Sequence, residues 1–106
     1  MTFTVRYSPE AEQQITMLFK YIATKASPGI ATRYVEAILT FCGKLQNFPL
    51  RGSPRDDIRL GIRTISYKKR TLIAYTVEES QVLILGIYYG GQDYESLIRE
   101  FDLDDD

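Results

Sequence analysis

The architecture follows most directly from residues 60–89, which read LGIRTISYKKRTLIAYTVEESQVLILGIYY. Three runs in this stretch are rich in β-branched and aromatic residues, which is typical of β-strands. The predicted strands are Leu60–Tyr67, Thr71–Val77 and Gln81–Tyr89. The turns between them, Lys68–Arg70 and Glu78–Ser80, are too short for a crossover connection. The three strands must therefore form an antiparallel meander.

Residues 2–46 predict one further strand and two helices. Apolar and polar residues alternate over Thr2–Tyr7, which is typical of a half-buried strand. Ser8-Pro9 and Ser27-Pro28 each combine a helix-capping residue with a proline at the first helical position. Apolar residues at helical spacing follow both pairs, and the first helix is expected to end near Lys25. The very short turn predicts an antiparallel helical hairpin.

The remaining segments complete a β-αα-βββ order within a single domain of residues 1–106. Asn47–Arg59 holds two prolines and a glycine without a sustained period, so it predicts a loop. Tyr94–Phe101 predicts a short helix, and residues 97–106 form an acidic tail that is expected to be partly disordered. The fold class is α+β, with a helical hairpin packed on a four-stranded, mainly antiparallel sheet.

The last three strands are apolar on both faces, although two helices can cover only one face of a sheet. Leu72 and Ala74 alternate with Ile73 and Tyr75, and residues 82–89 show the same mixture. Apolar surface is therefore left for a partner polypeptide to cover. The alternative is that the chain covers it with its own Leu97, Ile98 and Phe101.

Charge is distributed unevenly over the 106 residues, although the net charge is only −1. Gln92–Asp106 carries seven acids and one base, a net charge of −6, so the preceding residues carry +5. Arg51–Arg70 concentrates seven bases against two acids. The pattern favours an anionic partner or a solvated loop and hairpin. A sequence pI of about 5.4 is low for a strong nucleic-acid binder. We also expect the acidic tail to lie near Arg51–Arg70.

Composition excludes several classes of chemistry. The chain has no histidine and one cysteine, Cys42, so neither a metal site nor a cofactor is expected. Cys42 predicts a buried apolar residue in a cytoplasmic protein, and no window is apolar enough for a membrane span. Metal-independent cleavage of RNA is the one enzymatic reaction left open, because tyrosine, lysine and arginine can supply its acid, base and cations. The candidate residues are Arg63, Lys68, Lys69, Arg70, Tyr88, Tyr89 and Tyr94.

Motifs spread along the chain resemble the RelE/ParE superfamily of type II toxins, and within it the ParE branch. The order and spacing of these motifs carry the resemblance over roughly Phe3–Tyr94. The motifs are VRYSPEAEQQI, YIATKASPGIATRYVEAI, LQNFPLRG, GIRTISYKKRTLIAYTV and VLILGIYYGGQDY. The resemblance implies the same β-αα-βββ fold and a cytoplasmic toxin that takes part in plasmid stabilisation.

The superfamily implies two activities. RelE-like toxins cut messenger RNA on the ribosome, and they carry an arginine in the strand where this chain has Leu72, and basic or histidine residues after the last strand. Here that exit reads Gly90-Gly91-Gln92-Asp93. ParE-like toxins lack this catalytic set and inhibit DNA gyrase by protein–protein binding. The sequence therefore favours the non-enzymatic ParE-like function, with an endoribonuclease or a non-toxic antitoxin-binding module as alternatives.

The resemblance also implies a cognate ParD-like antitoxin, which would form a hetero-oligomer with the toxin. No sequence-specific contact with nucleic acid is expected. The predicted antitoxin-binding residues are Arg63, Leu72, Ala74, Tyr75, Val82 and Ile84. Arg63 is expected to pair with a carboxylate of the antitoxin, although a surface ion pair would equally explain it, and Tyr75 also fits a core position. The predicted target-binding residues are Arg70, Tyr88, Tyr89 and Gln92.

Overall fold

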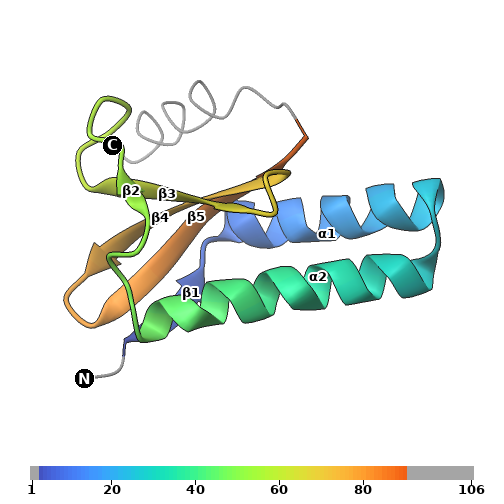
Figure 1. Cartoon of the computed structure of the whole chain (residues 1–106), viewed down its shortest axis with the longest axis horizontal. Helices are drawn as coiled ribbons and strands as arrows, with labels where there is room; N and C mark the ends of the chain where they lie inside the picture. Colours follow the sequence, from blue (N-terminus) through green and yellow to red (C-terminus); the bar gives the residue numbers. More distant parts are fainter. Residues whose placement is uncertain (1–2, 91–106) are drawn as a thin grey trace.

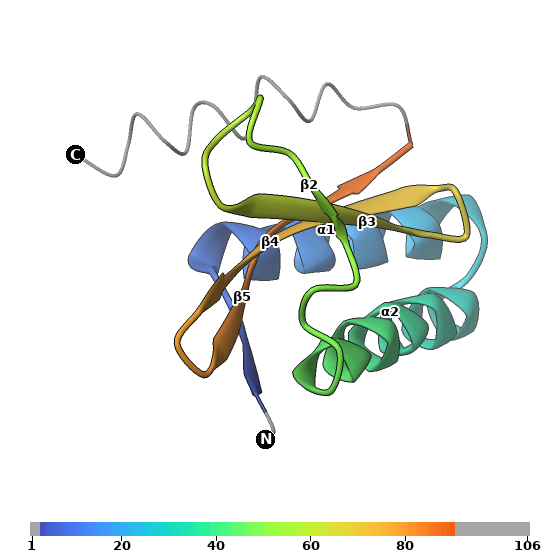
Figure 2. The same ribbon diagram turned by 60° about the vertical axis from the view of Figure 1, so that its left-hand side comes forward.

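The computed structural model describes residues 3–90. Two helices lie side by side on one face of a β-sheet (Figures 1 and 2). In chain order the elements are β1 (Thr4–Tyr7), α1 (Pro9–Lys25), α2 (Pro28–Gly43), the 3₁₀ helix η1 (Lys44–Gln46), β2 (Ser53–Pro54), β3 (Ile62–Tyr67), β4 (Thr71–Glu78) and β5 (Gln81–Tyr89). The predicted α+β class and the helical hairpin are confirmed.

Both helices begin at the predicted Ser-Pro pairs. The Ser8 hydroxyl accepts a hydrogen bond from the Ala11 amide at 3.1 Å, and the Ser27 hydroxyl accepts one from the Ile30 amide at 3.1 Å. These side chains satisfy amide groups that have no partner inside a helix. The first helix ends at Lys25, as predicted.

The sheet has five strands in the order β1-β5-β4-β3-β2. β1 joins the sheet through a parallel pairing with β5, in which Thr4 lies opposite Gln81. The other three pairings are antiparallel. An irregularity between β4 and β5 leaves Leu85 as an extra residue, since Tyr75 pairs with Ile84 but Ala74 pairs with Gly86. This bulge changes which residues of β5 face the helices.

The structure corrects two sequence predictions. The sheet has a fifth strand, β2, within the segment predicted to be only a loop, and β3 begins at Ile62 rather than Leu60. β2 is two residues long and ends in Pro54, which can pair only at a sheet edge because it has no amide hydrogen. The predicted helix at Tyr94–Phe101 and the acidic tail lie outside the described residues.

The main hydrophobic core lies between the helices and the sheet. Its members are fully or nearly fully buried, and they come from both helices, η1, β4 and β5. The buried residues are Ala11, Leu18, Ile22, Ala31, Ile38, Cys42, Leu45, Ile73, Tyr75, Val82, Ile84 and Ile87. The prediction that Cys42 is a buried apolar residue is confirmed.

The opposite face of the sheet, which we call the outer face, carries a second and smaller cluster. The segment between β2 and β3 rises on this side, away from the helices (Figure 2). Ile58 from that segment packs with Ile62, Ala74 and Tyr88. Leu72 and Leu85 pack against the cluster but are only half-buried. The outer face is therefore apolar, as predicted, but a loop covers only part of it.

Candidate protein-binding site

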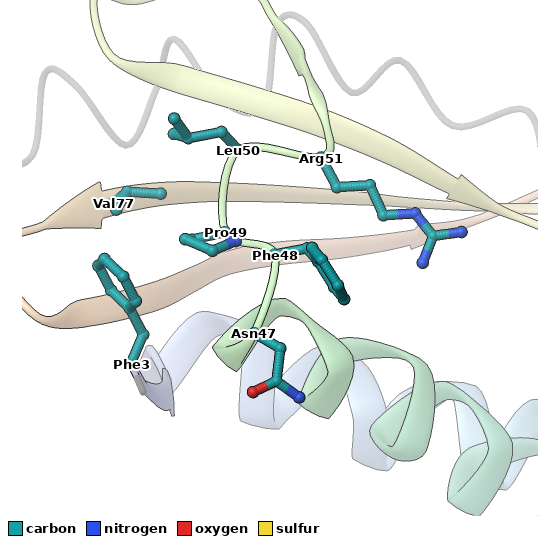
Figure 3. A pocket seen from close by; sticks show the side chains of 7 residues that line it. All are labelled: Phe3, Asn47, Phe48, Pro49, Leu50, Arg51 and Val77. Atoms are coloured by element: carbon teal, nitrogen blue, oxygen red, sulfur yellow. The ribbon is translucent and has the colours of Figure 1, made fainter. Parts of the chain in front are cut away.

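An open groove lies beside the loop that follows η1, and we call it the loop groove. It has a volume of about 840 Å³ and an almost entirely apolar lining. Figure 3 shows the side chains of Phe3, Pro49 and Val77 on one side of the loop, with those of Phe48 and Arg51 extending to the other. Its lining residues are Phe3, Asn47, Phe48, Pro49, Leu50, Arg51 and Val77.

Phe48 and Leu50 expose 68% and 63% of their surface, although both are large apolar residues. Burial would remove their apolar surface from water, so leaving them exposed forgoes roughly 25 cal/mol for every Å² of apolar area. Arg51 adds a cation beside them, and its guanidinium lies 5.6 Å from the centre of the Phe41 ring. The loop groove thus combines exposed apolar anchors with one positive charge.

Two side chains of the sheet hold this loop in place. The Tyr75 hydroxyl donates to the Pro49 carbonyl at 2.9 Å and accepts from the Gly52 amide at 2.8 Å. One guanidinium nitrogen of Arg63 donates to the Gly52 carbonyl at 2.7 Å and to the Leu50 carbonyl at 3.2 Å. Because Arg63 and Tyr75 lie opposite each other on β3 and β4, their two side chains reach the loop together.

Gly52 is required at this anchor because of close approach rather than backbone conformation. A Cβ atom there would lie 2.7 Å from the Tyr75 hydroxyl and 2.9 Å from the Thr64 carbonyl. Burial raises the pKa of Tyr75, while the Gly52 amide and the charges of Arg63 and Arg51 act in the opposite direction. The hydroxyl therefore keeps its proton at neutral pH and can donate to the loop.

A family model described as ParE toxin of the type II toxin–antitoxin system parDE matches residues 5–94. The chain belongs to this toxin family. Comparison with curated proteins gave no significant match.

Chains from two solved toxin–antitoxin structures share the fold. A chain of the chromosomal ParDE toxin–antitoxin system from P. aeruginosa is similar, with a TM-score of 0.74 and 18% sequence identity. The match covers 84% of this chain and 97% of that one. A chain of the toxin–antitoxin complex RelBE2 from Mycobacterium tuberculosis has a TM-score of 0.64 and 22% identity, over 84% of this chain and 99% of that one. At these identities the likeness establishes the fold.

The antitoxin-binding residues predicted for this ParE-family chain fall on both faces of the sheet. Tyr75, Val82 and Ile84 belong to the core beneath the helices, and each is 0% exposed. Ala74 is equally buried but lies in the outer cluster with half-buried Leu72. Of these residues, Arg63 and Tyr75 are the two whose side chains meet beneath the loop groove. Their role in antitoxin binding stays a prediction.

The predicted target-binding residues of the toxin are also separated. Arg70 is exposed in the turn between β3 and β4. Tyr88 is buried in the outer cluster, whereas Tyr89 packs on the helix side against Tyr21 and Tyr34, with ring centroids 5.8 Å and 5.9 Å away. Neighbouring residues of a strand point to opposite faces, so these two tyrosines cannot share one contact. Gln92 lies outside the described residues.

The free edge of β5 beyond β1 is closed by α1. The Ser8 hydroxyl donates to the Leu85 carbonyl at 3.1 Å, and the Gln14 side-chain oxygen accepts from the Ile87 amide at 2.7 Å. Burial raises the pKa of Tyr88 to about 12, although a hydrogen bond with Gln14 acts in the opposite direction. A phenol with such a pKa is a weak candidate for a general base near neutral pH.

Sequence reasoning missed the residues that line the loop groove, above all Phe3, Phe48 and Leu50. Two large apolar side chains beside Pro49, in a segment without helical or strand periodicity, were the available signal.

Within residues 3–90, histidine, cysteine and acidic side chains do not gather in groups of three that could bind a metal ion. Neither helix in these residues has the length and apolar character of a membrane span.

Proposed function

We propose that this chain is a ParE-like toxin that inhibits DNA gyrase by protein–protein binding and is neutralised by a cognate antitoxin. Membership of the ParE toxin family is the observation that carries the proposal. The proposal includes a cytoplasmic site of action and a part in plasmid stabilisation, since both follow from this kind of toxin.

The chemistry of the outer face supports a non-enzymatic toxin. Cleavage of RNA needs an acid, a base and cations that converge on one phosphate. In the part of the chain that the structure describes, the middle of this face is made of leucine, isoleucine, alanine and tyrosine side chains. Leu72 lies among them, at the position where the sequence resemblance places an arginine in RelE-like toxins.

The antitoxin is proposed to place an extended, apolar segment in the loop groove. Phe48 and Leu50 offer the kind of exposed anchors that become buried at the centre of protein interfaces. Arg51 lines the same groove, so the fitting segment carries an acidic residue beside its apolar ones. The loop groove is proposed in place of a site at Val82 and Ile84, because those two side chains are buried in the core whereas Phe48 and Leu50 are exposed.

The gyrase proposal is tested by plasmid supercoiling with purified gyrase and the full chain, free of any antitoxin. Loss of supercoiling, or accumulation of cleaved DNA above the gyrase-only control, is the expected result. No effect from protein with a cooperative unfolding transition would contradict gyrase inhibition. A ribosome-programmed messenger cleavage assay would then distinguish the RelE-like alternative, with which the likeness to the RelBE2 chain is compatible, from a non-toxic binding module.

The antitoxin site is tested with Phe48→Ser and Leu50→Ser together. Both side chains are exposed, so unfolding is expected to remain near wild type while binding of the protein encoded beside the toxin gene weakens strongly. Leu60→Ser is the matched control, because Leu60 is 84% exposed and does not line the groove. Equal binding by the double variant and the control would place the antitoxin elsewhere.

A further inference from the structure

The turn between β3 and β4 is strained and cationic, and neither the hydrophobic core nor the loop groove uses it. Lys68 and Lys69 have φ angles of 51° and 60°, in the left-handed region that disfavours residues with a Cβ atom. The Arg70 amide donates to the Tyr67 carbonyl at 3.1 Å and closes the turn around them. Two consecutive left-handed residues are the pattern of a type I′ turn, for which Asn-Gly is strongly preferred.

Packing does not explain the lysines. Both side chains are exposed, and Lys68 only lies over the Tyr67 ring, 5.5 Å from its centre. Strain of this kind is concentrated at functional sites, because a sequence selected only for stability would remove it. What the strained residues add is charge, since Lys68, Lys69 and Arg70 place three adjacent cations at the end of a hairpin.

The charge is left open to solvent. Within residues 3–90, the three cations have no ion pair with an acidic side chain. The next hairpin turn, between β4 and β5, carries Glu78 and Glu79 instead. Two hairpin turns of one sheet thus have opposite charge, and such a distribution orients a protein in the field of a charged partner.

The surroundings of the turn favour phosphates over an acidic protein surface. Tyr67 packs against Phe41 and Tyr34, with ring centroids 5.1 Å and 5.9 Å away, and Thr71 is buried. The tip therefore lacks the exposed apolar anchor that protein interfaces usually bury. Contacts with a phosphate backbone need only cations and hydrogen-bond donors.

We propose that the Lys68–Arg70 turn binds the phosphate backbone of duplex DNA, without reading its sequence. The contact is independent of the loop groove. Arg70 is also a predicted target-binding residue, but binding to duplex DNA is measured without gyrase, so this proposal stands or falls separately from the proposed function. A contact with the phosphate backbone alone is also compatible with the expectation that this chain makes no sequence-specific contact with nucleic acid.

The test combines DNA binding with thermal unfolding of the full chain. The variant Lys68→Asn with Lys69→Gly removes two charges and supplies the preferred type I′ residues. The control, Lys20→Gln with Lys44→Gln, removes two exposed charges from α1 and η1. Binding to a labelled 20-base-pair duplex is followed by fluorescence anisotropy over a range of salt concentrations.

For the turn variant we expect two opposite effects. The slope of log affinity against log salt becomes shallower by roughly 2, because each phosphate contact contributes about 0.9. The melting temperature rises by roughly 4–8 °C, because the strain is relieved. The control is expected to keep nearly the wild-type slope.

Three results would overturn the proposal. One is an equal change of slope in the turn variant and the control, which would indicate diffuse charge. Another is wild-type protein that does not bind the duplex at 50 mM salt. The third is tighter, turn-dependent binding of either a duplex RNA of the same length or a polyglutamate peptide, which would assign the turn to a different partner.

Discussion

The two faces of the sheet are built from the same strands but are used differently. Ile73 and Tyr75 of β4 point toward the helices and are fully buried in the main core. Leu72 of the same strand points outward and is half-buried, and Ile58 covers only part of its surroundings. Apolar residues on the helix side therefore stabilise the fold, whereas residues 3–90 leave those on the outer face and in the loop groove only partly covered. Four substitutions or titrations test this division, from the largest effect to the smallest.

Truncating one apolar side chain on each face gives the largest contrast. Ile73→Ala is expected to lower the free energy of unfolding by about 2–5 kcal/mol, because it leaves a cavity in the main core. Leu83 is half-buried and lies on the outward side of β5. Leu83→Ala is therefore expected to lower the free energy of unfolding by only about 1 kcal/mol. Urea unfolding of both variants measures the difference. Equal losses would show that the outer face contributes to folding as strongly as the core.

Removing the Tyr75 hydroxyl tests the anchor of the loop groove. Tyr75→Phe loses the bonds to Pro49 and Gly52 and leaves a buried amide unpaired, so a loss of about 2 kcal/mol is expected. Antitoxin binding should weaken as well, although Tyr75 itself is not exposed. Tyr34→Phe is the control, because it loses one hydrogen bond, to Thr71, and none to the loop, and it should cost about 1 kcal/mol. Unchanged binding by Tyr75→Phe would show that the loop keeps its shape without the anchor.

Alkaline pH is expected to weaken the helix side first. Burial raises the pKa of the Cys42 thiol from 9.0 to about 11, while its hydrogen bond with Tyr7 acts in the opposite direction. The folded state holds the thiol proton more tightly than the unfolded state does. The contribution of Cys42 to stability is therefore fully present below pH 9 and is lost as pH rises toward 11. Tyr88, on the outer face, loses its contribution between pH 10 and 12.

Urea unfolding between pH 8 and 11 measures this loss. In Cys42→Ala the decline should begin near pH 10 rather than near pH 9, since the tyrosines then titrate first. The same pH dependence in wild type and variant would assign the alkaline loss to other groups.

The smallest effect has the opposite sign. The Thr76 hydroxyl oxygen, on the outer face, is buried without a hydrogen-bond partner among residues 3–90. Thr76→Val removes this cost and is expected to stabilise the fold by up to about 1 kcal/mol. Thr71→Val is the matched change on the helix side, where the hydroxyl is bonded to Tyr34 at 2.9 Å, and it should destabilise the fold by about 1 kcal/mol. Thermal unfolding compares the two, and the same sign in both would contradict the assignment.

Local signals in the sequence predicted the helices and strands, but not which face of the sheet each side chain occupies. Ser8 and Ser27 mark the helix starts through capping, a rule that depends only on neighbouring residues. Ile84 and Tyr88 are four residues apart and would share a face in a regular strand, yet the bulge at Leu85 turns them to opposite sides. A bulge depends on the pairing of two strands, so a single strand's sequence does not reveal it.

The candidate site was less predictable because its parts are distant in sequence. Phe3, Phe48 and Val77 meet only after β1, the loop and β4 have been placed. The anchor shows the same dependence, since Tyr75 was a reasonable core residue by composition, and its hydroxyl bonds became visible only with the loop in place. Arg63 likewise shows how a basic residue in a strand can bind backbone carbonyls of its own chain.

The parallel pairing of β1 with β5 has a consequence for synthesis of the toxin. Thr4 is made first, but its partner Gln81 is translated 77 residues later. β5 is also the central connection between β1 and the rest of the sheet, so a chain that stops before it leaves β1 and one edge of β4 without partners. Such long-range closure is slow and is reached only late in translation. A chain that ends before β5 is therefore expected to lack the sheet on which the helices pack.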